Sequence, residues 1–300
     1  MKRRRKAIVI ILLSLLVICF LSVFEIYSNT ETIKNLEVQE NRNEDEIMRL
    51  ATYNQMFGMY GRSPIMNILG HISFHILHST KLTNLFSRFN KKDVEFVSKV
   101  NADIVSLNEV LGSLKKKEIK EELRKKGYKY FCWDRAEHYA PSLDIGTLLA
   151  SKEKFRKLEF DLPMESHFGG GGGACAINLK NKNLSILAVH LGLRKELIKK
   201  QLKTISKFVH EEKKKNNDII LMGDFNLDEK KMESDSIFEE LNLTEANDEK
   251  TSPNINFIKF FDFENVDNIF YCNSFKIEES EVLDGYSDHK LVWADISRKN

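Results

Sequence analysis

The stretch Asp218-Ile219-Ile220-Leu221-Met222-Gly223-Asp224-Phe225-Asn226 decides the fold class of this 300-residue chain. Its apolar run 219–222 predicts a buried strand, and Asp224 and Asn226 follow it. Polar side chains two residues apart at a strand end point to the same face. At a sheet edge they can meet a substrate instead of a core. We therefore expect an α/β protein with a site at a strand end.

Strand and helix patterns alternate from residue 47 onward. Strands are predicted at residues 47–53, 104–107, 145–150, 174–179, 184–189, 219–222, 266–271 and 291–296. Helices are predicted at 116–126, ending before Gly127, and at 196–215, with apolar residues at 198, 202, 205 and 209. No repeat or Pro/Gly linker divides this region, so residues 47–300 are predicted to form one domain.

Five segments at the ends of predicted strands carry side chains suited to phosphate chemistry. They hold Asn54, Glu109, His190, the pair Asp224 and Asn226, and the pair Asp288 and His289. Oxygen ligands hold Mg²⁺ and a histidine moves a proton, so this set suits hydrolysis of a phosphate ester. One such residue alone is usually a cap or a turn residue. Five such segments together favour a single hydrolytic site.

The net charge of +2 hides a slightly acidic main region. Five of the 46 basic residues lie at positions 2–6, and Glu25 is the only one of 44 acidic residues before position 29. The remainder therefore holds 41 basic and 43 acidic residues, a net charge of −2. Duplex-binding domains usually carry a basic excess, so the composition argues against one but leaves room for a local basic patch.

The four cysteines, Cys19, Cys132, Cys175 and Cys272, have no C-x-x-C spacing. They predict neither a structural zinc site nor a disulfide framework, and buried thiols are the expected state.

The N-terminus predicts a membrane anchor. Basic residues 2–6 precede eighteen uncharged, mostly apolar residues, 7–24, which at about 1.5 Å per residue span most of a roughly 30 Å hydrocarbon core. We assign residues 1–6 to the cytoplasm, 7–27 to a transmembrane signal anchor and 28–46 to an acidic juxtamembrane spacer. The remaining chain is then extracytoplasmic at the cell membrane. The alternative is secretion after signal cleavage, although no small-residue cleavage site follows.

Residues 58–92 form an apolar stretch with three histidines. His71 and His75 have the i, i+4 spacing of a zinc pair, but no glutamate follows His71 and no third ligand is evident. An amphipathic helix that caps the site or rests against lipid is the favoured interpretation.

Six segments resemble motifs of the endonuclease/exonuclease/phosphatase superfamily in order. They are LATYNQM, ADIVSLNEV, LAVHLGL, IILMGDFNL, NVDNIFY and YSDHKLVWADI, from about Leu50 to Ile296. GDFN and SDH at this spacing are the strong signals, whereas NEV alone is weak. Asn108 departs from the family, which more often has Gln there. The resemblance implies a two-sheet α/β sandwich with flanking helices, the DNase-like fold, here preceded by one transmembrane helix.

The resemblance also implies roles. Glu109 resembles a Mg²⁺ ligand with Asn54 beside it, Asp288 a second metal ligand, and Mn²⁺ is the alternative ion. His289 resembles a general base oriented by Asp267, and Asp224 resembles a group that positions or deprotonates water. The general base is left open between these two. Asn226 resembles a phosphate contact and His190 a donor to phosphate oxygens.

Two further patterns have competing interpretations. Residues Gly169–Gly173 could cradle a phosphate with exposed N–H groups, although a flexible hairpin is favoured. Arg194 and Gln201 resemble an Arg…Gln pattern of phosphodiesterase branches, although a solvated helix face is the plainer interpretation.

These observations predict a membrane-anchored, Mg²⁺-dependent phosphoester hydrolase. Tethering, the acidic domain and residues 58–92 favour a lipid head group or another small phosphodiester as substrate. A nuclease acting on DNA or RNA is the first alternative, and a non-catalytic binding protein is the second. The complete polar set argues against the second, and no protein partner is indicated.

Overall fold

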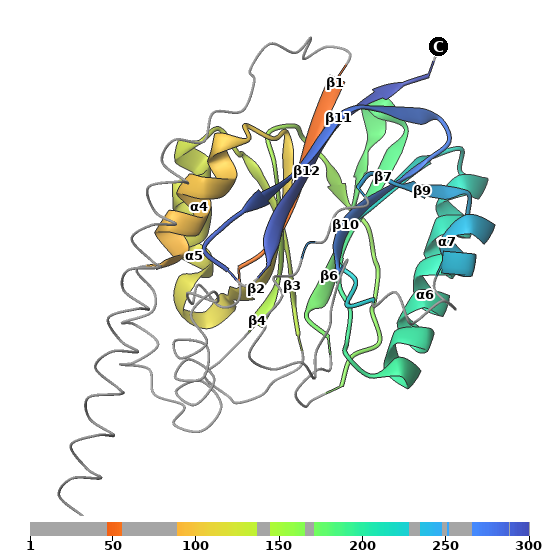
Figure 1. The fold of residues 1–300 in the computed structure, drawn as a ribbon, viewed down its shortest axis with the longest axis horizontal. Helices are drawn as coiled ribbons and strands as arrows, with labels where there is room; N and C mark the ends of the chain where they lie inside the picture. Colours follow the sequence, from red (N-terminus) through yellow and green to blue (C-terminus); the bar gives the residue numbers. More distant parts are fainter. Residues whose placement is uncertain are drawn as a thin grey trace, which may run out of the picture.

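A computed structural model describes residues 47–55, 89–136, 145–165, 171–227, 235–247, 251, 266–287 and 289–299. These residues form two six-stranded sheets packed face to face, with helices on both outer faces (Figure 1). The predicted two-sheet α/β sandwich is therefore confirmed.

The first sheet has the strand order β11-β12-β1-β2-β4-β3. Its strands are β1 (Ile47–Asn54), β2 (Ile104–Leu111), β3 (Tyr130–Arg135), β4 (Ile145–Ser151), β11 (Phe275–Asp284) and β12 (Lys290–Arg298). Only β1 and β2 are parallel, and Asn54 is in register with Asn108. This pair brings two polar residues to one end of the sheet.

The second sheet has the order β5-β6-β7-β8-β10-β9. Its strands are β5 (Arg156–Lys157), β6 (Gly173–Leu179), β7 (Leu184–His190), β8 (Asp218–Asp224), β9 (Leu243–Glu245) and β10 (Asp267–Cys272). It also has one parallel pair, β7 and β8, whose register places His190 beside Asp224. Each sheet thus ends its parallel pair with polar side chains.

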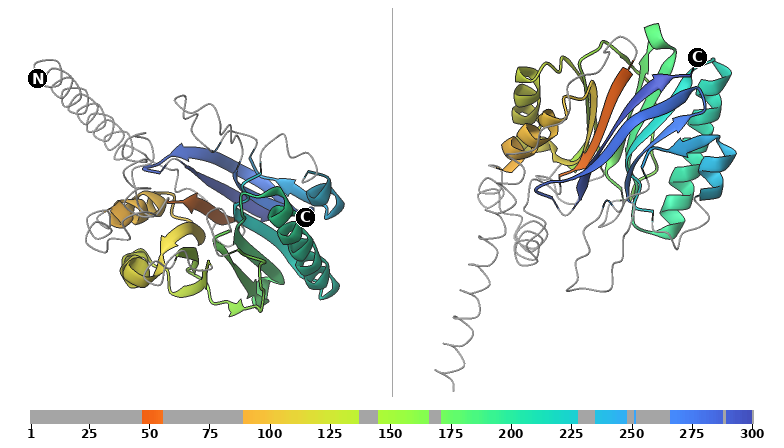
Figure 2. Two further views of the ribbon diagram at one scale, coloured as in Figure 1. Left: turned by 90° about the horizontal axis from the view of Figure 1, so that it is seen from below. Right: turned by 45° about the horizontal axis from the view of Figure 1, so that its top comes forward.

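Helices α4 (Phe89–Lys99) and α5 (Gly112–Lys125) cover the outer face of the first sheet, and α6 (Lys195–Lys214) and α7 (Asp235–Glu240) cover that of the second (Figure 2). A short 3-10 helix, η3 (Lys180–Lys182), joins β6 to β7. The predicted apolar positions of α6, 198, 202, 205 and 209, are all buried.

Two apolar clusters hold the layers together. One lies between the sheets and continues under α6 and α7, and it includes Leu50, Ile104 and Leu221. The other fills the space under α4 and α5, where Phe96, Leu123 and Trp293 are almost completely buried. Burial of this apolar surface is the main stabilising contribution.

All eight predicted strands and both predicted helices are present. Residues 89–92, which the sequence analysis assigned to the apolar insertion, instead form the beginning of α4. Several shorter elements were not predicted: β3, β5, β9, β11 and α7. Residues 1–46 and 58–88, with the proposed anchor, spacer, His71 and His75, lie outside the described residues. Among the helices that are described, none has the length and hydropathy of a membrane span.

Candidate active site

The predicted site residues converge at one end of the sandwich. Asn54, His190 and Asp224 are the last residues of β1, β7 and β8, and Asp267 is the first of β10. His289 directly precedes β12. Because the two parallel pairs end on the same side, residues from both sheets meet there. Asp288 lies outside the described residues, so its predicted metal-binding role stays a prediction.

Asp224 joins the two sheets. Its Oδ2 accepts a hydrogen bond from Asn54 Nδ2 at 2.8 Å, and its Oδ1 accepts one from the Asn226 backbone N–H at 2.9 Å. The same Oδ2 lies 3.6 Å from His190 Nε2 and 3.9 Å from His289 Nδ1. The carboxylate is 1% exposed, and these hydrogen bonds hold it in one orientation.

His289 and Asp267 form the shortest polar contact of the site. His289 Nδ1 lies 2.5 Å from Asp267 Oδ2. Asp267 is fully buried, and its backbone N–H donates to Thr251 Oγ1 at 3.0 Å. A carboxylate at Nδ1 fixes the ring and its tautomer, so proton transfer falls to Nε2. The structure therefore places Asp267 where the predicted orienting residue should lie.

His190 faces two carboxylates from a dry environment. Its Nε2 lies 3.7 Å from Glu109 Oε1, a similar distance to that from Asp224. Burial lowers the pKa of His190; Asp224 opposes this shift and His289 adds to it. Its Nδ1 is buried and, within the described residues, has no hydrogen-bond partner. A neutral ring can donate Nε2–H to an anionic ligand.

The glycine segment lies against His190. Gly172 N–H donates to the His190 carbonyl at 2.9 Å, and a Cβ on Gly172 would lie 1.8 Å from His190 Nδ1. Gly172 therefore makes room for the ring, and the next residue, Gly173, is in register with His190. Residues 169 and 170 lie outside the described residues, and the phosphate-cradle interpretation stays a prediction.

Glu109 does not follow its strand as expected but lies within β2, at an irregularity. The pairing of β2 with β4 shifts between Leu107 and Val110, and Glu109 has φ 56°. A β-bulge of this kind redirects a side chain toward a site. The two neighbours in register, Asn54 and Asn108, lie beside it.

In the sequence, Asn108 is notable only because the family more often has Gln at this position. The fold shows which hydrogen bonds its side chain makes. Its Nδ2 donates to Thr147 Oγ1 at 3.1 Å and to the Val189 carbonyl at 2.9 Å. Val189 precedes His190, so this amide ties the Glu109 strand to the His190 strand across the sandwich. No local sequence pattern identifies such a contact, because its partners are 39 and 81 residues away.

Tyr53 is a second residue that sequence reasoning missed. Its hydroxyl accepts hydrogen bonds from the backbone N–H groups of Tyr286 and Ser287, at 3.0 and 2.8 Å. Ser287 Oγ in turn accepts from His289 N–H at 3.1 Å. Tyr53 thus holds the turn that presents His289, although in the sequence it looks like a core aromatic.

Other predicted residues have structural contacts. Asn226, at φ 48°, donates from Nδ2 to the Leu191 carbonyl at 2.9 Å. Gln201 is fully buried and bridges the Gly192 N–H and the Pro163 carbonyl. Arg194 is half exposed and pairs with Glu165.

The carboxylates of the site fit a divalent cation. Glu109 Oε1 and Asp224 Oδ2 both approach His190 Nε2, so they face the same space. Asp224, Asp267 and His289 offer ligand atoms within 4.8 Å of one another. Within the described residues, the ion pairs of Asp224 involve histidines and no lysine or arginine. Buried negative charge of this density calls for a cation, and carboxylate oxygens are hard ligands.

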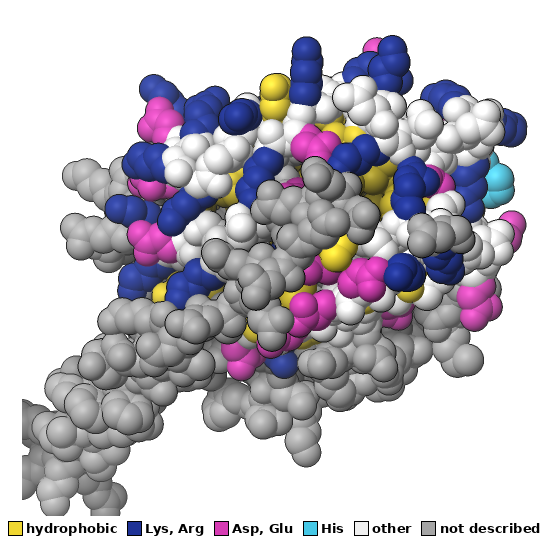
Figure 3. Space-filling view, turned by 90° about the horizontal axis from the view of Figure 1, so that it is seen from above, with side chains coloured by type: hydrophobic (Ala, Val, Ile, Leu, Met, Phe, Trp, Pro, Cys, Tyr) yellow, Lys and Arg dark blue, Asp and Glu magenta, His cyan; other side chains and the backbone are white. Residues whose placement is uncertain are grey.

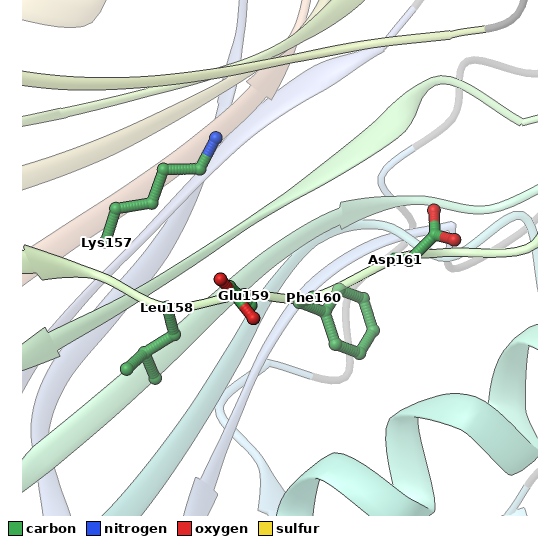
Figure 4. A pocket seen from close by; sticks show the side chains of 5 residues that line it. All are labelled: Lys157, Leu158, Glu159, Phe160 and Asp161. Carbon is green, nitrogen blue, oxygen red and sulfur yellow. The ribbon is translucent and has the colours of Figure 1, made fainter.

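A surface pocket elsewhere does not compete with this site. It is lined by five consecutive residues that begin with the last residue of β5: Lys157, Leu158, Glu159, Phe160 and Asp161 (Figure 4). The Phe160 ring packs against Phe208 of α6, with ring centroids 5.2 Å apart. The pocket contains none of the clustered histidines or carboxylates.

The model of the "Endonuclease/Exonuclease/phosphatase family" matches residues 78–289, more than half of the chain. The chain belongs to this family. The resemblance predicted from its motifs is thereby confirmed. No curated protein matches the sequence.

Solved structures share the fold at low sequence identity. An endonuclease/exonuclease/phosphatase from Beutenbergia cavernae has a TM-score of 0.62 and 17% identity, with 85% of this chain and 72% of that chain covered. The human Nocturnin catalytic domain has a TM-score of 0.58 and 15% identity, with 85% and 94% covered. ANGEL2, described as a 2′,3′-cyclic phosphatase, has a TM-score of 0.60 and 15% identity, with 84% and 95% covered.

Proposed function

We propose that this protein is a divalent-metal-dependent hydrolase of phosphodiesters. The observation that carries the proposal is the His289–Asp267 pair at 2.5 Å, next to the Asp224 carboxylate and opposite Glu109 and His190. Family membership supports it. A positioned base, two convergent carboxylates and a neutral histidine donor are the groups that phosphate-ester hydrolysis needs.

We assign a role to each residue on the basis of these contacts. His289, oriented by Asp267 through Nδ1, takes a proton at Nε2 from the attacking water. Asp224, fixed by Asn54 and by the Asn226 N–H, orients that water. His190 donates to a non-bridging phosphate oxygen. Glu109, with Asn54 beside it, would hold the metal ion, which when bound neutralises the phosphate charge.

The membrane anchor, extracytoplasmic location and lipid head-group substrate remain predictions. They depend on residues 1–46 and 58–88, which lie outside the described residues. A chromogenic diester, bis(p-nitrophenyl) phosphate, avoids any assumption about the substrate.

The test is hydrolysis of this diester by the full chain, with Mg²⁺ or Mn²⁺ and after chelation. We expect metal-dependent turnover that Glu109→Gln lowers by at least about a hundredfold, a loss of roughly 2.7 kcal/mol in transition-state stabilisation. The matched control is Glu153→Gln; this residue pairs with Lys182 at 2.6 Å, outside the cluster. Turnover that survives chelation, or near-normal turnover of Glu109→Gln at an unchanged melting temperature, would contradict the proposal.

A further inference from the structure

Two buried cysteines face each other across the space between the sheets. Cys132 lies on β3, the edge strand of the first sheet, and Cys175 lies on β6 of the second. Both belong to the apolar layer between the sheets, and both are free thiols in the structure. The Cys175 thiol reaches the Thr147 carbonyl oxygen, at 3.7 Å, and the sulfur of Cys132. The two cysteines are therefore neighbours, although they are far apart in the sequence.

The backbones of β3 and β6 approach closely at this edge. Ala174 N–H donates to Asp134 Oδ2 at 2.9 Å, and a Cβ on Gly173 would lie 3.2 Å from the backbone carbonyl of Asp134. β3 runs toward the site end and β6 away from it, because β3 and β2 are each antiparallel to β4 and β6 is antiparallel to β7. Two residues back from Asp134 is Cys132, and two residues on from Gly173 is Cys175, on the same faces. A disulfide needs such closeness, since its Cα atoms are about 5.5–6 Å apart.

The two thiols differ in acidity. The hydrogen bond from Cys175 lowers the pKa of Cys132 and outweighs the opposing effect of burial. The charges of Lys157 and Lys120 lower that pKa further, whereas Asp134 opposes them. Burial raises the pKa of Cys175, and its hydrogen bond to Cys132 raises it further. Because the thiolate is the nucleophilic form, Cys132 is the sulfur suited to react first, with the Cys175 thiol beside it.

Burial of the thiols restricts the reagent that can reach them. Charged and other polar side chains cover most of the face seen in Figure 3, and apolar side chains show there only in small patches. The two cysteines lie below the protein surface, with exposed fractions of 2% for Cys132 and 0% for Cys175. Access requires a local opening of the edge strand β3, and a small uncharged oxidant needs the smallest opening.

We propose that Cys132 and Cys175 form a modification site, at which hydrogen peroxide converts the two thiols into a disulfide that links the two sheets. The Cys132 sulfur attacks one peroxide oxygen, so an S–O bond forms, the O–O bond breaks, and the departing hydroxide takes the Cys132 proton to give water. The Cys175 sulfur then attacks the Cys132 sulfur. An S–S bond forms, the S–O bond breaks, and the second hydroxide leaves as water with the Cys175 proton. The sulfurs are oxidised by two electrons in total, and the peroxide is reduced by the same two.

The disulfide has a structural consequence that does not depend on the proposed function. It closes a loop of about 40 residues, which restricts the unfolded chain and so stabilises the folded one. It also fixes the beginning of β6, where Gly173 is in register with His190. Oxidation should therefore be detectable both as a covalent bond and as a gain in thermal stability.

The test treats the full chain, reduced and then freed of reductant, with hydrogen peroxide under native conditions. Free thiols are alkylated with iodoacetamide, and an unreduced tryptic digest is analysed by mass spectrometry. We expect residues 130–135 to be joined to residues 158–180, in a product about 2 Da lighter than the sum of the two peptides and separated by dithiothreitol. The melting temperature should rise by at least about 5 °C.

Three variants sharpen the test. Cys132→Ser and Cys175→Ser should each lose the cross-link and the gain in melting temperature. Cys272→Ser is the matched control and should keep both, because that buried thiol lies on β10, beside Asp218. In Cys175→Ser, dimedone should label Cys132 as a sulfenic acid, whereas in Cys132→Ser it should leave Cys175 unlabelled. Peptide mapping of the wild-type chain decides the question even where a variant does not fold.

Several outcomes would overturn the inference. They are alkylation of both Cys132 and Cys175 after peroxide treatment, conversion of Cys132 to a sulfinic acid without a cross-link, a cross-link that forms only in the urea-unfolded chain, and a cross-link without a rise in melting temperature. These measurements are covalent and thermal, so they are independent of diester hydrolysis. The proposed function can therefore fail without affecting them.

Discussion

The two parallel strand pairs, β1–β2 and β7–β8, each deliver polar residues to the site, but in different ways. In β7–β8 the register is continuous to His190 and Asp224, so the strand ladder alone places both residues. In β2 the pairing with β4 is interrupted at Glu109, the site residue of this strand, which has φ 56°. The bulged half is tied to the regular half by Asn108 and by the Asn54–Asp224 bond. The site residues of the β7–β8 pair can be located from a sequence motif. The placement of Glu109 in the β1–β2 pair depends instead on contacts between the sheets.

The crossover helices of the two halves differ as well. Asp93 on α4 is 2% exposed, and its Oδ2 has no hydrogen-bond partner within the described residues. Burial raises the pKa of Asp93 well above 3.8, and Lys92 opposes this shift. Burial also acts to raise the pKa of Glu212 on α6, but hydrogen bonds from Lys215, Ser185 and Asn217 outweigh it and lower that pKa below 4.5. Glu212 is thus stabilised as a carboxylate, whereas Asp93 is not.

The largest effect on turnover is expected at Asp224, where the two strand pairs meet. Asp224→Asn keeps the shape but removes the charge that faces Asn54, His190 and His289. We expect turnover of a diester to fall about a thousandfold, a loss of roughly 4 kcal/mol. Asp218→Asn, at the other end of the same strand, is the matched control and should stay within about twofold of wild type. A decrease of less than tenfold for Asp224→Asn would show that the two halves do not depend on this carboxylate.

Asn108 distinguishes contacts between the sheets from contacts within one. Asn108→Leu leaves the Val189 carbonyl and Thr147 Oγ1 without this donor, so unfolding free energy should fall by about 1–3 kcal/mol. Asn178→Leu is a matched control, because among the described residues that buried amide donates to Leu184 and Ser185, which belong to its own sheet. Denaturant titration should show losses in both variants, whereas only Asn108→Leu should also lower kcat. If Asn108→Leu and Asn178→Leu had equal kcat values, the inter-sheet amide of Asn108 would not position Glu109.

The smallest effect concerns the buried acids and depends on pH. Asp93 has a raised pKa in the folded state, so stability is lost as pH rises from the unfolded pKa through the folded one. Asp93→Asn should therefore raise unfolding free energy by about 1 kcal/mol at pH 7 and give no gain near pH 3. Glu212 has a lowered pKa, so Glu212→Gln should lower stability at pH 7, with the difference shrinking in acid. Parallel pH profiles for the two variants would contradict this contrast.

The sequence alone determined the elements with strong local patterns and the residues next to them. Buried strands such as β8 are apolar runs, and α6 repeats its apolar positions every three to four residues, so local spacing was sufficient. β11 could not be found in this way. It is an edge strand with exposed Lys276, Glu278, Glu279, Glu281 and Asp284, and its pairing with β12 defines it.

Only the tertiary structure decided how the site is assembled. The motifs named Asp267 and His289. Their 2.5 Å contact exists because β10 and β12, which belong to the two facing sheets, both begin at the same end of the sandwich. The bulge at Glu109, the Asn108 bonds to the opposite sheet and the Tyr53 hydroxyl that holds residues 286–287 have no local signature. These contacts join residues 81 to 234 positions apart, and periodicity within a segment carries no information about such partners.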